Sequence, residues 1–528
     1  MAELRTETMT VNMGPQHPST HGVLRLILEL DGETIQSART TIGYLHTGIE
    51  KTAEQKKWQQ VVPLVERMDY LAAQSNSLCY VLSVEKLLGL EMPQRVKDIR
   101  VLLAELQRLA SHLVWIGTHA MEIGAVSMLF YAIRERELLM NINELIAGFR
   151  FFPSYFRVGG LREDLARGFH EAVNAFLDRF PKKIDEFEGL LTKNDMFLRR
   201  TEGVGVISQE DALAWGLVGP IARGSGSDYD VRKYFPYTGY ETYDFKVPTA
   251  TEGDVFARYR VRVAEMRESV KIARQAIQRI TPSGAWACDD TRVVPPPKDK
   301  VYTEMEALIQ HFLIYSQGFT VPAGEAYVPV EGPRGEHGVY IVSDGTNRPW
   351  RVKMRPPSFM AIQALPKIIE GGMIADVVAV IGSNDVVMGT ATGELSSRDG
   401  ICAGEVPQVG TEAGGAGRAV QVHTREPGEV RSERHAVSAG PAEVGDSLRG
   451  LSCAEAAGLP DGGGDAARGG ADPLHARGGR GRRVVLHDVL HAPRRQVRAE
   501  RLPHAVVRAA WRRARHRGAE REARDQAR

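Results

Sequence analysis

Two side chains, His21 and Tyr70, are of types that can donate hydrogen bonds and then protons to a small substrate. His21 ends the segment Pro15–His21, PQHPSTH, which Gly22 follows. Because its two prolines and the following glycine restrict the backbone, this segment is predicted to form a turn that presents His21 at the tip of a β-hairpin. A lone loop histidine is more often without a chemical task, and Tyr70, predicted on an amphipathic helix, is of a type more often found in the core.

Three further residues suggest a metal site. His112, His119 and Glu122 fall at i, i+7 and i+10 and therefore share one face of a long predicted helix. Helical bundles hold metals with Glu-x-x-His pairs, but that motif requires two copies. The order here is His-x-x-Glu, and the sequence has no evident second copy. A metal site on this face is therefore not favoured.

Cofactor motifs are otherwise weak. The four cysteines lack the Cys-x-x-Cys spacing, and an iron–sulfur cluster usually needs four converging thiolates; they are Cys79, Cys288, Cys402 and Cys453. The glycine pair in Arg223–Asp228 has neither a preceding strand nor a following helix, so it is only a weak signal for a nucleotide loop and is interpreted as structural. We expect no cofactor to be bound by this chain alone.

Charge and hydropathy argue against a nucleic-acid-binding, a secreted or a membrane-spanning protein. The 67 Lys+Arg nearly balance the 66 Asp+Glu, so no strong field favours nucleic acid. The N-terminus has no apolar signal region, and no run of 18 apolar residues occurs. The sequence therefore predicts a chain that is neither secreted nor membrane-spanning by itself.

The elements that must position these side chains are mainly helical. β-type residues at Val23–Ile27 and Thr34–Thr41 flank the turn signal Asp31-Gly32, which indicates a small antiparallel sheet. Helical periodicity predicts three long helices, at Val62–Leu88, from Pro93 onward, and at Val255–Ile280. A packed irregular loop is expected at Gly219–Thr249. Short strands at Val339–Ser343 and Trp350–Met354 and a helix near Phe359–Ile369 complete an α+β, mainly α, fold.

The amino-acid composition changes abruptly after Gly389. The remaining residues contain 23 Arg but no Lys, Asn, Phe or Tyr. One interpretation is a disordered, low-complexity Arg/Gly tail. Shifting the reading frame of Val485–Arg498 and Glu500–Ala509 gives strings that resemble the thioredoxin-like iron–sulfur subunit of respiratory complex I. The sequence thus predicts an N-terminal β region with the His21 loop (1–45), a helical core domain (46–389) and a tail (390–528) that is out-of-frame translation of a neighbouring gene.

An ordered series of motifs across residues 9–389 resembles the D subunit (49-kDa subunit) of NADH:quinone oxidoreductase, respiratory complex I. The motifs are MGPQHPSTHGVLRL, IGYLHTGIEK, RMDY, SVEKLLG, REREL, YFRVGG, DVRKYFPY, RYRVRVAEMRES, GEHGVYIVSDGTNRPWRVKMRPPSF and DVVAVIGSNDVVMG. The resemblance also extends to the large subunit of nickel–iron hydrogenases and implies a similar long-helix bundle. Hydrogenases bind their metals through two Cys-x-x-Cys motifs, but the corresponding stretches, Gly43–Lys51 and Asp385–Met388, contain no cysteine.

The resemblance assigns roles to individual residues. His21 and Tyr70 are expected to flank a quinone headgroup and supply protons. Glu122, where the family usually has Asp, is expected to orient His21. Arg67 is expected near the terminal iron–sulfur cluster of a neighbouring subunit, where a fixed cation would stabilise the reduced cluster.

The implied function is that of the quinone-site subunit of this proton-translocating oxidoreductase, active only within the complex. Electrons would reach ubiquinone or menaquinone from the adjacent subunit's cluster, with NAD and the clusters on other subunits. The expected partners are the small cluster-bearing subunit, a second hydrophilic subunit and the quinone-channel membrane subunit, on the cytoplasmic side of a bacterial inner membrane. A non-catalytic assembly scaffold of a hydrogenase-like complex is the alternative.

Overall fold

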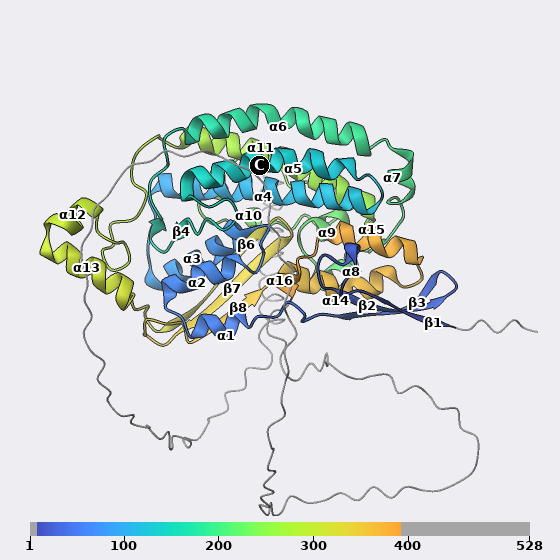
Figure 1. The fold of residues 1–528 in the computed structure, drawn as a ribbon, viewed down its shortest axis with the longest axis horizontal. Helices are drawn as coiled ribbons and strands as arrows, with labels where there is room; N and C mark the ends of the chain where they lie inside the picture. Colours follow the sequence, from blue (N-terminus) through green and yellow to red (C-terminus); the bar gives the residue numbers. More distant parts are fainter. Residues whose placement is uncertain (1–7, 392–528) are drawn as a thin grey trace, which may run out of the picture. The chain divides into compact units, whose positions relative to one another are not determined.

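In a computed structural model of the chain, residues 8–391 form a helical bundle flanked by small antiparallel sheets (Figure 1). These residues are the part of the chain that the structure describes. The α+β, mainly α, fold class predicted from the sequence is confirmed. The interpretation of residues 390–528 as an out-of-frame tail lies outside the described residues, apart from Thr390 and Ala391. The division into regions 1–45 and 46–389 stays a prediction.

The N-terminal sheet consists of β1 (Met9–Met13), β2 (Arg25–Asp31) and β3 (Thr34–Thr41), all antiparallel. The hairpin predicted from the sequence is therefore present, as β2 and β3. A third strand, β1, which the sequence did not suggest, pairs with β2. Alternate leucines of β2 are buried and belong to one apolar cluster with residues of α14 (Pro357–Ile369) and α15 (Ile374–Asn384). This shared cluster fixes the sheet, and with it the β1–β2 loop that carries His21, against the bundle.

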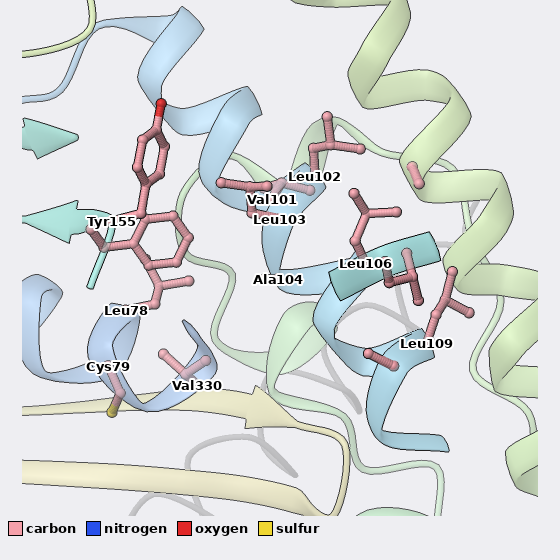
Figure 2. Close-up of a cluster of buried hydrophobic side chains, with 14 of the residues drawn as sticks. Leu78, Cys79, Val101, Leu102, Leu103, Ala104, Leu106, Leu109, Tyr155 and Val330 are labelled. Carbon is pink, nitrogen blue, oxygen red and sulfur yellow. The ribbon is translucent and has the colours of Figure 1, made fainter. Parts of the chain in front are cut away.

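The bundle is built around α4 (Gln94–Glu122), which packs against α5 (Ser127–Ala147) and α11 (Val255–Arg279). In turn, α11 contacts α6 (Phe169–Leu191). These helices run side by side in the upper part of Figure 1. Figure 2 shows leucines of α4 in the core beside Leu78, Tyr155 and Val330. Buried residues cover nearly the whole circumference of α4, as expected for a central helix.

The second three-stranded sheet consists of β6 (Gly324–Gly332), β7 (Gly335–Ser343) and β8 (Arg351–Arg355). The helix α3 (Ala73–Leu88) contacts β6 and β7. At that contact the Cys79 thiol is 3.2 and 3.4 Å from the carbonyl oxygens of Val328 and His337, to which it donates. Figure 2 shows the Cys79 side chain beside the sheet. The strands and the helix predicted after Pro322 are confirmed. Only two residues connect β6 to β7, and one of them is Arg334.

The remaining elements are short. They are η1 (Pro18–Thr20), α1 (Ile49–Glu54), α2 (Trp58–Glu66), β4 (Phe156–Arg157), β5 (Gly160–Leu161), α7 (Asp195–Arg199), α8 (Gln209–Ala214), α9 (Gly219–Gly224), α10 (Val231–Tyr234), η2 (Tyr240–Thr242), α12 (Lys298–Thr303), α13 (Met305–Ser316) and α16 (Met388–Ala391).

Two predictions of local structure are wrong. A single helix over Val62–Leu88 is replaced by α2 and α3, because Asp69 Oδ1 accepts from the backbone N–H groups of Leu71 and Ala72 and so ends the helical pattern. The stretch Gly219–Thr249 is not an irregular loop throughout, since it forms α9, α10 and η2. Ion pairs made by Arg223 and Arg232 stabilise these short helices, and periodicity does not detect such contacts.

A buried ion pair gives a test of this packing. Arg100 binds Glu85 with two hydrogen bonds, of 2.8 and 2.7 Å, and also donates to the carbonyl oxygens of Arg157 and Gly160. Arg100→Met would leave the Glu85 carboxylate buried without its cation. We expect the free energy of unfolding to fall by about 3–5 kcal/mol, measured by urea denaturation of the purified chain.

The matched control is Arg274→Met, because Arg274 pairs with Asp178 at the surface, where its side chain is 44% exposed. Exposed pairs contribute about 0–1 kcal/mol. Equal effects of the two substitutions would contradict the conclusion that the buried pair of Arg100 and Glu85 stabilises the core.

Candidate functional site

His21 lies at the end of the short turn η1, in the loop that joins β1 to β2. The loop orders itself through its own polar groups: His17 Nδ1 accepts from the Ser19 N–H, and the Thr20 hydroxyl donates to the carbonyls of His17 and Pro15. His21 itself has φ 49°, in the left-handed region that non-glycine residues seldom adopt. The loop therefore holds the imidazole at the hairpin tip, as the sequence predicted.

The structure brings His21 and Glu122 together. Their Nε2 and Oε1 atoms are 3.4 Å apart, and the side chains are 13% and 5% exposed. Burial, followed by the positive charge of Arg334, lowers the pKa of His21 to about 4. Burial, followed by the negative charge of Asp385, raises the pKa of Glu122 to about 8. These shifts favour a neutral imidazole beside a protonated carboxyl group at neutral pH, and the Glu122 side chain is long enough to bring Oε1 within 3.4 Å of His21 Nε2.

Tyr70 and Arg67 lie in the turn between α2 and α3, not on a continuous helix. Burial raises the pKa of Tyr70, Arg334 opposes this rise, and Asp69 and Asp385 add to it. Arg334 therefore acts on both Tyr70 and His21. Arg67 does not join this group through any contact found in residues 8–391: its guanidinium lies 5.0 Å from the ring centroid of Phe152 and donates to the Pro63 carbonyl.

Arg334 is the residue that sequence reasoning missed. Its guanidinium is buried and binds Asp69 at 2.8 and 3.1 Å and Asp385 Oδ1 at 3.0 Å, while Nε donates to the Asp385 carbonyl. It thus ties the Tyr70 turn to the β6–β7 turn and to the segment after α15. The sequence signal that could have indicated Arg334 is the turn Gly332–Gly335, Gly-Pro-Arg-Gly, in which the one charged residue lies between residues typical of turns. At the following Gly335, φ is 118° and a Cβ would lie 2.6 Å from the Gly219 nitrogen.

His112 and His119 are not parts of one site. His112 Nε2 lies 3.1 Å from Glu265 Oε2, and Glu265 in turn accepts from Arg223 at 2.8 Å. Arg223 also donates to Glu331 at 2.9 Å, so the first residue of the stretch Arg223–Asp228 belongs to a buried ion-pair network. Across the described part of the chain, no group of three or more His, Cys, Asp or Glu residues is arranged to hold a metal ion. The metal interpretation of His112, His119 and Glu122 has no support.

Comparison with known proteins shows to which family the chain belongs. Residues 122–392 match the family model described as the respiratory-chain NADH dehydrogenase 49 Kd subunit. The chain is 56% identical over 384 residues to the NADH-quinone oxidoreductase D subunit of Geotalea uraniireducens (strain Rf4), in an alignment that covers 73% of this chain and 98% of the relative. The chain belongs to the 49-kDa, or D, subunit family of respiratory complex I.

Other members of the D subunit family are about equally similar. The NADH-quinone oxidoreductase D subunits of Citrifermentans bemidjiense and Geobacter sulfurreducens are 56% and 55% identical to the chain over 386 and 384 residues. Each alignment covers 73% of the chain, and they cover 99% and 98% of the respective relatives. The family recognised from the sequence motifs is thereby confirmed. Among residues 8–391, no helix has the length and apolar character needed to cross a bilayer.

The pKa of Glu122 predicts a pH-dependent stability. Between the ordinary value of 4.5 and about 8, the folded chain keeps a proton on Glu122 that the unfolded chain has lost. The free energy of unfolding of the parent therefore falls as pH rises through this window. Glu122→Gln cannot ionise, so we expect it to become increasingly more stable than the parent from pH 4.5 to 8, measured by urea denaturation at several pH values.

Glu163→Gln serves as the control, since Glu163 is 54% exposed and its ion pair is at the surface. It is expected to change stability little at any pH. A Glu122→Gln difference that does not vary with pH would contradict the protonated state of Glu122.

Proposed function

We propose that this complex I subunit forms the quinone-reduction site of the proton-translocating NADH:quinone oxidoreductase. In this proposal, electrons pass from the iron–sulfur cluster of the adjacent small subunit to ubiquinone or menaquinone. The observation that carries the proposal is the buried contact between His21 and Glu122 at 3.4 Å, with Tyr70 under the same electrostatic influence of Arg334.

His21 and Tyr70 bind the two carbonyl ends of the quinone headgroup by donating hydrogen bonds. Reduction of a quinone to a quinol takes two electrons and two protons, and the carbonyl oxygens become basic as the electrons arrive. Donors already aimed at those oxygens stabilise the charged state more than the neutral one. Tyr70 gives one proton, and the buried cation Arg334 stabilises the phenolate that remains.

The second proton passes through His21. Because the imidazole is neutral at pH 7, one nitrogen carries a proton while the other can accept one. The Glu122 carboxyl gives its proton to His21 Nε2, and His21 gives its Nδ1 proton to the quinone oxygen. Atoms and charges balance: with two electrons and two protons the quinone becomes quinol, Tyr70 is left as a phenolate, Glu122 as a carboxylate, and His21 returns to the neutral form.

Arg67 and the partners complete the proposal. Arg67, stacked on Phe152, faces the neighbouring subunit's cluster and stabilises its reduced state. The chain is held among the small cluster-bearing subunit, a second hydrophilic subunit and the quinone-channel membrane subunit, on the cytoplasmic face of a bacterial inner membrane. NAD and all clusters are bound by other subunits, and the reaction occurs only within the complex.

The test is Tyr70→Phe, which removes the proton-donating hydroxyl and keeps the ring. We expect inhibitor-sensitive quinone reduction by membranes to fall by about 10²-fold or more, the range for loss of a positioned proton donor, while electron transfer from NADH to an artificial acceptor is kept. Membranes with the same amount of assembled complex and unchanged quinone reduction would instead indicate a non-catalytic assembly scaffold.

A further inference from the structure

The Glu122 carboxyl group has a second imidazole beside it. One oxygen, Oε1, faces His21, while the other, Oε2, lies against Gly382 of α15. A Cβ atom on Gly382 would lie 2.4 Å from Glu122 Oε2 and 2.6 Å from His119 Nδ1, so these two atoms are at most about 5 Å apart. The missing side chain of Gly382 thus leaves a space that the carboxyl oxygen and the imidazole nitrogen share.

The His119 ring is held in place by aromatic neighbours. It stacks on Trp115 at 5.5 Å between centroids and 17° between planes, and it meets Phe197 edge-on at 6.0 Å. Trp115 Nε1 donates to the Gly382 carbonyl at 2.9 Å, which fixes α15 against this part of α4. The packing therefore directs Nδ1 of His119 toward the space beside Gly382.

His119 is 1% exposed, yet neither of its ring nitrogens has a hydrogen-bond partner within residues 8–391. Glu122 Oε2 also lacks one. Unpaired buried polar atoms are destabilising and occur rarely, so two of them side by side require an explanation. A hydrogen bond between His119 and Glu122 that forms in only one state of the reaction would explain why both groups are unpaired in the structure.

The surrounding charges define that state. His119 is under the electrostatic influence of Arg262, His21 and Arg258. Asp385 acts in the same way on Glu122, and Arg334 acts on His21. Burial, followed by Arg262, His21 and Arg258, lowers the pKa of His119 to about 3, so its ring is neutral at pH 7. A neutral ring offers one N–H donor. When Glu122 has given up its proton, His21 lies on the Oε1 side of the carboxylate, and His119 is a further donor, on the Oε2 side, that has no acceptor among the described residues.

We propose that His119 is a positioning residue for quinone reduction: its Nδ1–H donates to the Glu122 carboxylate after the Glu122 proton has moved to His21, in the space that Gly382 leaves open. The inference rests on the proposed quinone-site function and extends it. No proton is gained or lost by His119 in this step. The new bond stabilises the carboxylate that the proton transfer creates, which favours the transfer.

A matched pair of variants, His119→Asn and His119→Leu, tests the proposal in assembled complex I. Asn and Leu have nearly the same size, and only Asn retains a hydrogen-bond donor near the Nδ1 position. The readout is inhibitor-sensitive quinone reduction by membranes, measured as a function of pH on both sides of the Glu122 pKa. Tyr70→Phe is measured in parallel.

In the parent, activity is expected to fall as pH rises through about 8, because the resting carboxyl then loses its proton. In His119→Leu we expect kcat at pH 7 to fall roughly tenfold or more, the effect of losing a hydrogen bond to a charged group. The alkaline limb should also move to higher pH, because the carboxylate is less stable. His119→Asn should stay closer to the parent in both respects.

Equal behaviour of the Asn and Leu variants, whether both impaired or both like the parent, would overturn the role of His119 as a donor. If Tyr70→Phe loses quinone reduction in the same experiment, equal behaviour of the Asn and Leu variants would overturn only the role of His119 and would leave the quinone-site function standing. If Tyr70→Phe keeps quinone reduction, the quinone-site function itself fails.

Gly382→Ala is a second, independent test. Alanine suits the helical backbone of α15, but its Cβ would lie 2.4 Å from Glu122 Oε2 and 2.6 Å from His119 Nδ1, so these side chains must shift. The comparison is therefore made between membranes that contain equal amounts of assembled complex. Its methyl group would occupy the shared space and separate the two atoms. We expect a loss of quinone reduction similar to that of His119→Leu. An assembled Gly382→Ala complex with the parent's activity and pH profile would overturn the proposal.

Discussion

The candidate site depends on one buried cation, Arg334, and its two carboxylates. A guanidinium taken out of water is tolerated only where its donors are satisfied and its charge is balanced, and Asp69 and Asp385 do both. Each partner comes from a different segment: Asp69 from the turn that carries Tyr70, and Asp385 from the residues after α15. The ion-pair geometry therefore holds three distant parts of the chain together, and its charges modify the pKa shifts that burial causes at His21, Tyr70 and Glu122.

This arrangement explains why the His21–Glu122 contact is not an ordinary salt bridge. Burial disfavours a charge on either group, the positive Arg334 further disfavours imidazolium, and the negative Asp385 further disfavours a carboxylate at Glu122. Both groups are consequently neutral near pH 7, and the proton is stored on the carboxyl. Electrons arriving at a neighbouring acceptor would raise the proton affinity of His21, because negative charge next to it favours the imidazolium. The proposed function uses this change to draw the proton from Glu122.

The sequence predicted the features that depend on local pattern. The apolar positions of α4 and α11, the β-type residues of β2 and β3 and the turn signal at Asp31-Gly32 each lie within a short window of sequence, so local pattern is enough to predict these elements. The pairing of His21 with Glu122 followed from the family resemblance alone. The break before Tyr70 was missed, because it depends on an Asp69 side chain that bonds the backbone locally. The contact between Arg334 and Asp69 was missed because it joins residues hundreds of positions apart, which no spacing rule detects.

The proposed proton transfer requires that Glu122 carries a proton in the resting complex at neutral pH. Infrared spectroscopy of the oxidised complex, recorded while the pH is raised, measures protonated buried carboxyl groups directly. We expect a carboxylic-acid band that loses intensity as the pH passes about 8 and that is absent from the Glu122→Gln variant. A parent spectrum that already matches the Glu122→Gln spectrum at pH 7 would mean that Glu122 is ionised at rest, which would exclude it as the source of the second proton.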